Sequence, residues 1–150
     1  DYSGKCGIEL RGHSTQDAAK KTYSIELWTN DGADTSVALM GLPKEEDWVL
    51  HASAFDKSLL RNELSFYLFE RMGNDAPRTR FCEVVLDGDY KGVYQLMEKV
   101  KRDKNRVNIA KLDADDNAGD SLRGVYGSVN CNGIVGIAQQ PLRLLVQGGA

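Results

Sequence analysis

Apolar and polar positions alternate along two stretches of the chain, at residues 5–11 and 22–28. Alternation with a period of two is the pattern of a strand that buries one face. In the second stretch, one face carries Tyr23, Ile25 and Leu27. A short apolar run at residues 48–51, placed after a loop, adds a third predicted strand.

Two further β-rich runs, residues 80–86 and 90–99, lie on either side of Asp87-Gly88-Asp89. An Asp-Gly pair between such runs is a strong hairpin signal, because a tight turn of the primed type needs positive φ. The sequence therefore predicts an antiparallel pair of strands here.

Residues 58–72 carry the periodicity of a helix rather than of a strand. Asp56 or Ser58 can cap its first amides, and Gly73 follows as a C-terminal stop. Its apolar stripe consists of Leu60, Leu64, Tyr67, Leu68 and Met72. The element order predicts an α+β fold, with one main helix packed on a mostly antiparallel sheet.

The composition is that of an ordinary soluble domain, with 150 residues, 41% hydrophobic and 27% charged residues, and a net charge of -3. Nothing in it points to nucleic acid, and no apolar run is long enough to span a membrane. Three cysteines without short spacing favour buried or free thiols over a disulfide framework or a zinc site. Because the chain has neither an initiator Met nor a signal peptide, we expect it to begin inside a larger reading frame.

The charge distribution divides the chain near residue 122. All 22 acidic residues lie at or before Asp120, and residues 123–150 contain no Asp, Glu or Lys. The acidic stretch at 113–120 is interpreted as a solvated loop. We therefore treat residues 1–122 as the folded domain and 123–150 as an irregular tail of different origin.

The candidate chemistry lies where Lys20 and Lys21 enter the second strand, close to a polar turn that contains Arg11 and Ser14. A lysine binds phosphate as a flexible point charge, an arginine can grip it with two donors, and a serine offers a hydroxyl. Only one of two successive lysines can face a site on the sheet, and we favour Lys21. The alternatives are solvated lysines and a turn held by side-chain to backbone bonds.

Other charged residues allow a functional and a structural interpretation. Glu63 or Glu70 on the helix could orient a strand lysine, or could belong to a solvated face. Glu98 could stand where the chain leaves the small sheet beside a purine, or could pair with Lys99 or Lys101. The basic run 99–106 is interpreted as a solvated segment, and the two separated histidines support no metal site.

Several blocks, in this order and spacing, resemble the CotH (spore coat protein H) kinase-like family from about residue 7 to residue 122. They are Arg11-Gly-His-Ser-Thr-Gln16, Lys20 to Trp28, Gly41-Leu-Pro43, Asp47-Trp-Val-Leu50, Asp56 to Asn62, Arg71-Met-Gly73, Ala76 to Arg80, Gly92-Val-Tyr94 and Glu98 to Val107.

The resemblance implies the N-terminal part of an atypical protein kinase, similar to the small lobe of eukaryotic kinases. It implies ATP with magnesium or manganese as cofactor and a Ser or Thr of a protein as acceptor. Lys21, or Lys20, would hold the α- and β-phosphates, Arg11 and Ser14 would lie near the phosphates, and Glu98 would lie near the linker between lobes. It also implies an extracellular, cell-surface or spore-coat location.

The chain departs from the family pattern after Leu122, where the family continues with Gly-Gly-Tyr and an aliphatic residue. Here the sequence reads Arg123-Gly-Val-Tyr-Gly127. Codons for these residues, read one base later, can encode Gly-Gly-Tyr-Met, so we hypothesise that 123–150 is out-of-frame sequence. The catalytic carboxylates that the family needs are expected beyond this point.

We therefore interpret the chain as a fragment of a CotH-type protein Ser/Thr kinase that is inactive by itself. The alternative from another class is a non-catalytic surface or coat module that keeps the fold for binding. The third interpretation is a truncated product without a function of its own.

Overall fold

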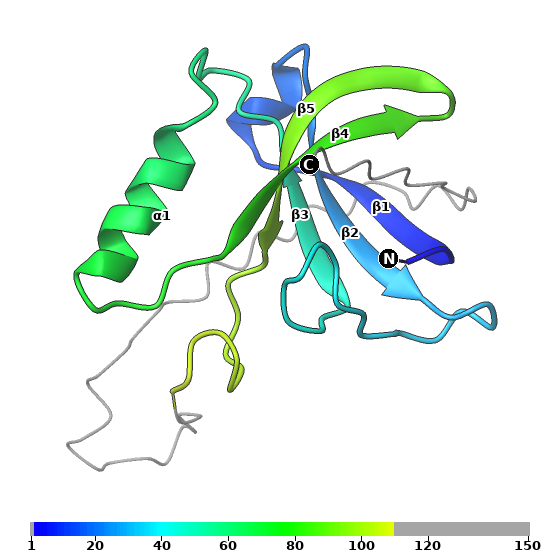
Figure 1. Cartoon of the computed structure of the whole chain (residues 1–150). Helices are drawn as coiled ribbons and strands as arrows, with labels where there is room; N and C mark the ends of the chain where they lie inside the picture. Colours follow the sequence, from blue (N-terminus) through cyan, green and yellow to red (C-terminus); the bar gives the residue numbers. More distant parts are fainter. Residues whose placement is uncertain (1, 110–150) are drawn as a thin grey trace.

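The strands form one five-stranded sheet in the computed structural model, which describes residues 2–109 (Figure 1). The elements in chain order are β1 (Lys5–Arg11), the 3-10 helix η1 (Ser14–Asp17), β2 (Thr22–Trp28), β3 (Asp47–His51), α1 (Arg61–Arg71), β4 (Thr79–Leu86) and β5 (Asp89–Glu98). The order across the sheet is β1-β2-β3-β5-β4, and all neighbours are antiparallel. The predicted α+β class with one main helix is confirmed.

The hairpin between β4 and β5 forms at the predicted Asp-Gly pair. Asp87 has φ 52° and Gly88 has φ 80°, and Leu86 pairs directly with Asp89. Two successive residues with positive φ are the requirement of a type I′ turn, whose twist matches that of the strands.

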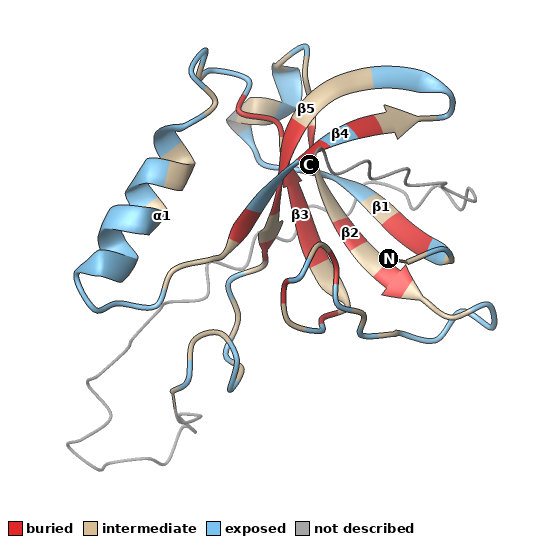
Figure 2. Ribbon diagram, in the orientation of Figure 1, coloured by how far each residue is buried: buried red, intermediate tan, exposed pale blue. Residues whose placement is uncertain are grey.

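The core lies on one face of the sheet, where cross-strand neighbours bring apolar side chains together. Figure 2 shows the buried residues along the strands. Ile25 pairs with Trp48, and Leu50 pairs with Leu96 in the next strand. The segment between β2 and β3 contributes Leu39 and Leu42 to the same cluster. Cys6 and Cys82 are buried and free, and burial raises the pKa of the Cys82 thiol to about 11.

Helix α1 begins at Arg61, three residues later than predicted. Asp56, five residues before Arg61, caps its first amide. The Asp56 carboxylate accepts hydrogen bonds from the Arg61 amide at 2.9 Å and from the Ser58 amide at 3.0 Å. Gly73 follows the last turn with φ 85° and ends the helix as the sequence predicts. The intervening residues 58–60 form a turn rather than helix.

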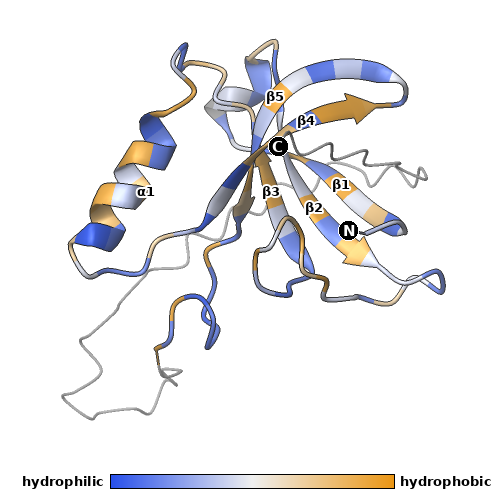
Figure 3. Cartoon of the chain, viewed as in Figure 1, coloured by the Kyte–Doolittle hydropathy of each residue, from blue (hydrophilic) through white to orange (hydrophobic). Residues whose placement is uncertain are grey.

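The prediction that α1 packs on the sheet through its apolar stripe is wrong. All five stripe residues are more than half exposed, at 51–76%. Figure 1 shows the helix standing away from the sheet, and Figure 3 shows apolar bands along it. A side-chain hydrogen bond joins α1 to the sheet, from the Thr79 hydroxyl to Glu63. The 3.6-residue period encodes an apolar face, but it does not say which surface covers that face.

The predicted acidic loop at 113–120 and the tail at 123–150 lie outside the described residues. No helix within residues 2–109 is both long and apolar enough to cross a membrane.

Candidate functional site

The connection between β1 and β2 brings the Gly12 backbone close to the Thr15 side chain. Gly12 has φ 100°, and a Cβ there would collide with the Thr15 hydroxyl oxygen. The Gln16 side-chain amide donates to the Gly12 carbonyl at 2.5 Å. These contacts are the side-chain to backbone bonds of the structural interpretation, and they hold the turn in a fixed place at the end of the sheet.

Lys21 faces this turn, as the sequence analysis favoured. Its ammonium donates a hydrogen bond to the Gln16 carbonyl. An ammonium has three donors, so this bond leaves others available for a ligand.

Lys20 turns toward the other strands instead. It donates to the Val93 carbonyl, and its Nζ lies 4.3 Å from the centre of the Tyr94 ring. Burial lowers the pKa of Lys20. Neither Lys20 nor Lys21 has a carboxylate within ion-pair distance in the part of the chain that the structure describes.

Arg11 and Lys20 act on a histidine that the sequence analysis did not assign to this site. Burial, followed by the positive charges of Arg11 and Lys20, lowers the pKa of His51, whereas Asp56 acts in the opposite direction. Arg11, Lys20, Lys21 and His51 lie at one end of the sheet, here called the turn end, where the arginine and the two lysines are cationic. Ser14 opens η1 at this same end.

The helix carboxylates do not orient either lysine. Glu63 accepts its hydrogen bond from Thr79 on β4, and Glu70 is exposed. Because α1 stands away from the sheet, the ion pair that the kinase comparison suggested is absent from the described residues. The alternative of a solvated face holds for Glu70.

Glu98 lies away from the turn end, five residues along β5 from the Val93 carbonyl that Lys20 contacts. Its carboxylate is 3% exposed and makes two parallel bonds with Arg78, at 2.9 and 3.0 Å. Its amide donates to the Arg78 carbonyl at 3.2 Å. The expected partners Lys99 and Lys101 are wrong, because both reach Asp47 on β3 instead.

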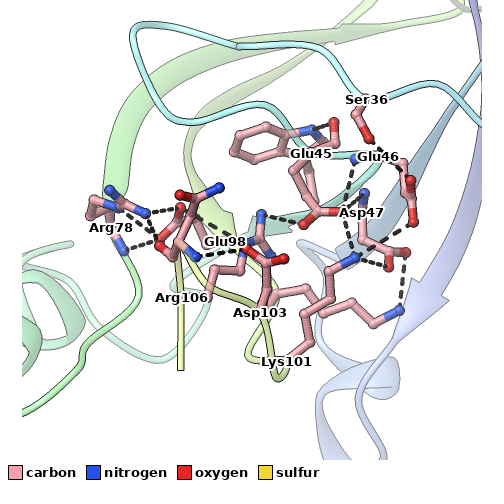
Figure 4. Close-up of polar contacts among 12 residues, drawn as sticks. Ser36, Glu45, Glu46, Asp47, Arg78, Glu98, Lys101, Asp103 and Arg106 are labelled. Carbon is pink, nitrogen blue, oxygen red and sulfur yellow. Dashed lines mark hydrogen bonds and ion pairs between the residues drawn. The ribbon is translucent and has the colours of Figure 1, made fainter. Parts of the chain in front are cut away.

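A network of paired charges surrounds Glu98 and is called the linker end (Figure 4). The Lys101 ammonium lies 2.5 Å from Glu45, 3.6 Å from Glu46 and 3.5 Å from Asp47. The Arg106 side chain is 4% exposed, and its guanidinium lies 3.3 Å from Glu45 and 3.9 Å from Glu98. Within the basic run, Lys99, Lys101 and Arg106 are therefore partners of these acids, whereas Arg102 and Lys104 are exposed as a solvated segment predicts.

Glu45, Glu46 and Asp47 are close enough together to ligate a cation, although the sequence analysis did not single them out. The run of three consecutive acidic residues in the sequence could have predicted this cluster. Burial would raise the pKa of Glu45, but the Lys101 ammonium and Arg106 hold it below its ordinary value. Lys99, Lys101 and Arg106 already pair with these carboxylates, so a metal ion would have to displace them.

The face of the sheet that carries Arg11 also contains a hollow of about 160 Å³ near the far end of β1 and β2. Its lining includes Gly7, Glu26, Trp28, Asp47 and Lys99. The Trp28 ring lies against Gly7 so closely that a Cβ there would be 2.7 Å from it. Burial, helped by nearby Asp34 and Asp47, raises the pKa of Glu26.

A larger cleft of about 600 Å³ lies between α1 and the end of β5. Apolar side chains such as Phe66, Phe69 and Met97 line it, together with Arg78 and Glu98. Arg78 and Glu98 bind each other, and the lining also includes the charged residues Glu70, Asp75, Lys99 and Arg106.

These elements define an α+β unit with an antiparallel sheet, a helix inserted between its third and fourth strands, and a cationic turn. The CotH kinase protein family matches residues 8–129, and the chain belongs to this family. The match runs past the predicted break after residue 122.

A relative from Bacillus subtilis (strain 168), inner spore coat protein H, is 32% identical over 96 residues. The matched stretch is 62% of this chain and 23% of that relative. The chain thus matches less than a quarter of the relative's length.

Proposed function

We propose that this chain is the nucleotide-binding part of a CotH-type protein Ser/Thr kinase, similar to a kinase small lobe. ATP with magnesium or manganese is the cofactor, and a Ser or Thr of a protein is the acceptor. The chain by itself binds nucleotide without transferring the phosphoryl group, because the catalytic carboxylates are expected beyond Leu122 and residues 123–150 contain no Asp or Glu. The observation that carries the proposal is the cationic turn end.

The geometry of the β1–β2 hairpin supports a nucleotide lying along it. One face of this hairpin carries Gly7, Glu9 and Arg11 of β1. Their cross-strand partners on the same face of β2 are Glu26, Ser24 and Thr22. Four residues of strand separate the hollow at Gly7 from Arg11, which is roughly 13 Å. This length is comparable to that of an extended nucleoside triphosphate, with the base in the hollow and the phosphates at the turn end.

The carboxylates on this face favour a divalent metal in the complex. Glu9 lies between the hollow and Arg11 and would repel phosphate oxygens directly. A magnesium or manganese ion bound with the nucleotide offsets that repulsion and prefers oxygen ligands.

The element order also supports the comparison with kinases, although one feature differs. Kinases carry their phosphate-binding lysine on the strand before the helix, paired with a helix glutamate. In this chain that strand, β3, has no lysine, and the lysines stand at the start of β2. The phosphate-binding role therefore falls to Lys21, with Lys20 and Arg11 beside it.

The printed name of the Bacillus subtilis relative favours a second function, a non-catalytic module of the spore coat. In that case the fold serves for binding other coat components, and its location is the spore coat. The kinase proposal places the protein in the same location, so location alone does not separate the two.

Titration of the 150-residue chain with ATP and magnesium or manganese tests the proposal. We expect ATP to raise the melting temperature, and Lys21→Glu to weaken binding at least about tenfold through loss of charge attraction to phosphate. Lys91→Glu is the matched control, because Lys91 lies near the β4–β5 turn and pairs with Asp89. Unchanged affinity in Lys21→Glu contradicts the assigned role, and absence of ATP binding in the wild type favours the coat module.

A further inference from the structure

A row of polar side chains crosses four neighbouring strands at the turn end. Arg11 pairs with Thr22, and the register of Tyr23 with Leu50 places Thr22 beside His51. The Thr22 hydroxyl accepts a hydrogen bond from the Ala52 amide at 3.1 Å, which fixes this alignment. His51 pairs in turn with Gln95 on β5.

The row lies on the face of the sheet opposite the apolar core. Neighbouring strands are about 4.8 Å apart, so the row from Arg11 to Gln95 spans roughly 14 Å. Phe81 on β4, the other neighbour of Gln95, closes the row with an apolar side chain.

Gln95 is the unusual member of this row. Its side chain is 1% exposed, yet neither its amide oxygen nor its amide nitrogen has a hydrogen-bond partner. Leaving a buried amide without hydrogen-bond partners destabilises the fold. Its amide therefore provides two donors and an acceptor with nothing to bind in the described part of the chain.

His51 lies beside Gln95 and is only partly buried. The charged groups acting on it are Arg11 from β1 and Lys20 from the start of β2, with Asp56 from the segment before α1. Glu63 of α1 is bound to Thr79 instead. Because burial and the two cations lower its pKa, His51 is neutral at pH 7 in the free protein. It can therefore take up a proton when an anion binds beside it.

We infer that His51 and Gln95 form a subsite for a phosphoryl oxyanion, with the imidazole and the side-chain amide as donors and Arg11 as the charge on the same face of the sheet. The inference rests on the proposed function for the identity of the ligand as a nucleotide. A free polyphosphate has the same oxyanion chemistry, so both are used as probes. Gln95 pairs directly with His51 across one strand spacing, so the unpartnered amide and the imidazole are neighbours on this face.

The first test measures binding of ATP and of inorganic tripolyphosphate to the 150-residue chain at about pH 6 and about pH 8 by calorimetry. An anion raises the pKa of His51, so we expect proton uptake and binding that is several-fold to about tenfold tighter at the lower pH. His51→Gln should lose this component, whereas His13→Gln, which removes the other histidine, should retain it. Protonation of the phosphate itself is common to all variants and cancels in the comparison.

The second test uses Gln95→Met, which keeps the side-chain length and removes the amide. Since an unpaired buried amide destabilises the fold, we expect the melting temperature to rise and the affinity for both probes to fall several-fold. A lower melting temperature with unchanged affinity means that Gln95 serves the fold alone and overturns the subsite.

The outcomes separate this inference from the proposed function. If ATP binding depends on Lys21 but survives either His51→Gln or Gln95→Met unchanged, the subsite is wrong and the nucleotide proposal stands. If tripolyphosphate binds as tightly as ATP, and both variants lose it, the subsite is right and the nucleotide assignment is wrong. If the wild type binds neither probe, both are wrong.

Discussion

The turn end and the linker end of the sheet contain similar cations in different environments. At the linker end, Lys99, Lys101 and Arg106 each lie within ion-pair distance of a carboxylate. At the turn end, Lys20 and Lys21 donate to backbone carbonyls, with no carboxylate paired to them within residues 2–109. The two ends thus use the same residue types for different purposes.

This difference teaches which charges are available to a ligand. A cation that already has a buried carboxylate partner contributes to the fold, and removing it leaves that carboxylate unpaired. A cation held by a neutral carbonyl keeps its net charge. The charge available for phosphate is therefore concentrated at the turn end, although the longer basic run lies at the linker end.

The largest expected effect is that of Arg106→Met at the linker end. It removes the guanidinium between two buried carboxylates, Glu45 and Glu98, and we expect the free energy of unfolding to fall by about 3 kcal/mol. Lys20→Met at the turn end, which loses a carbonyl bond and a contact with Tyr94, should cost about 1 kcal/mol. Denaturant unfolding measures both, and equal losses would contradict the comparison.

A smaller effect is that the two ends should respond to acid in separate pH windows. The lowered pKa of His51 contributes stability that is present above its unfolded value of 6.5 and is lost as the pH falls through the folded value. The lowered pKa of Glu45 contributes stability that is present above its unfolded value of 4.5 and is lost as the pH falls through the folded value.

Unfolding measured across this pH range, with one variant for each end, checks the two windows. His51→Gln should remove the upper window alone, and Lys101→Met should diminish the lower one, because Lys101 helps to hold the Glu45 pKa down. If both variants changed the same pH window, the prediction that the two ends titrate separately would be wrong.

The smallest expected effect on stability is that of salt. Raising NaCl from about 0.05 M to about 0.5 M should change the free energy of unfolding little, because the Arg106 and Glu98 charges are buried and weakly screened. The same change should weaken nucleotide binding at the exposed Arg11 clearly. A strong salt effect on stability with none on binding would reverse the assignment of the two ends.

Local patterns predicted most of the elements correctly. The alternation at 5–11 and 22–28 gave the bounds of β1 and β2, and Asp87-Gly88 gave the hairpin, because both signals depend only on neighbouring residues. The alignment of Lys21 with the turn also followed from strand alternation. The Glu98 partner was wrong because Arg78 is distant in sequence and adjacent only through the β4–β5 pairing.

The sequence by itself determined the strands, the hairpin, the helix and the family, since periodicity, turn chemistry and motif spacing are properties of short segments. Only the tertiary structure decided which cations are paired, that His51 and Gln95 join Arg11 in one row, and that the apolar stripe of α1 remains uncovered. These depend on strand register and on which surfaces meet. A single residue of slip would move every side chain of a strand to the other face.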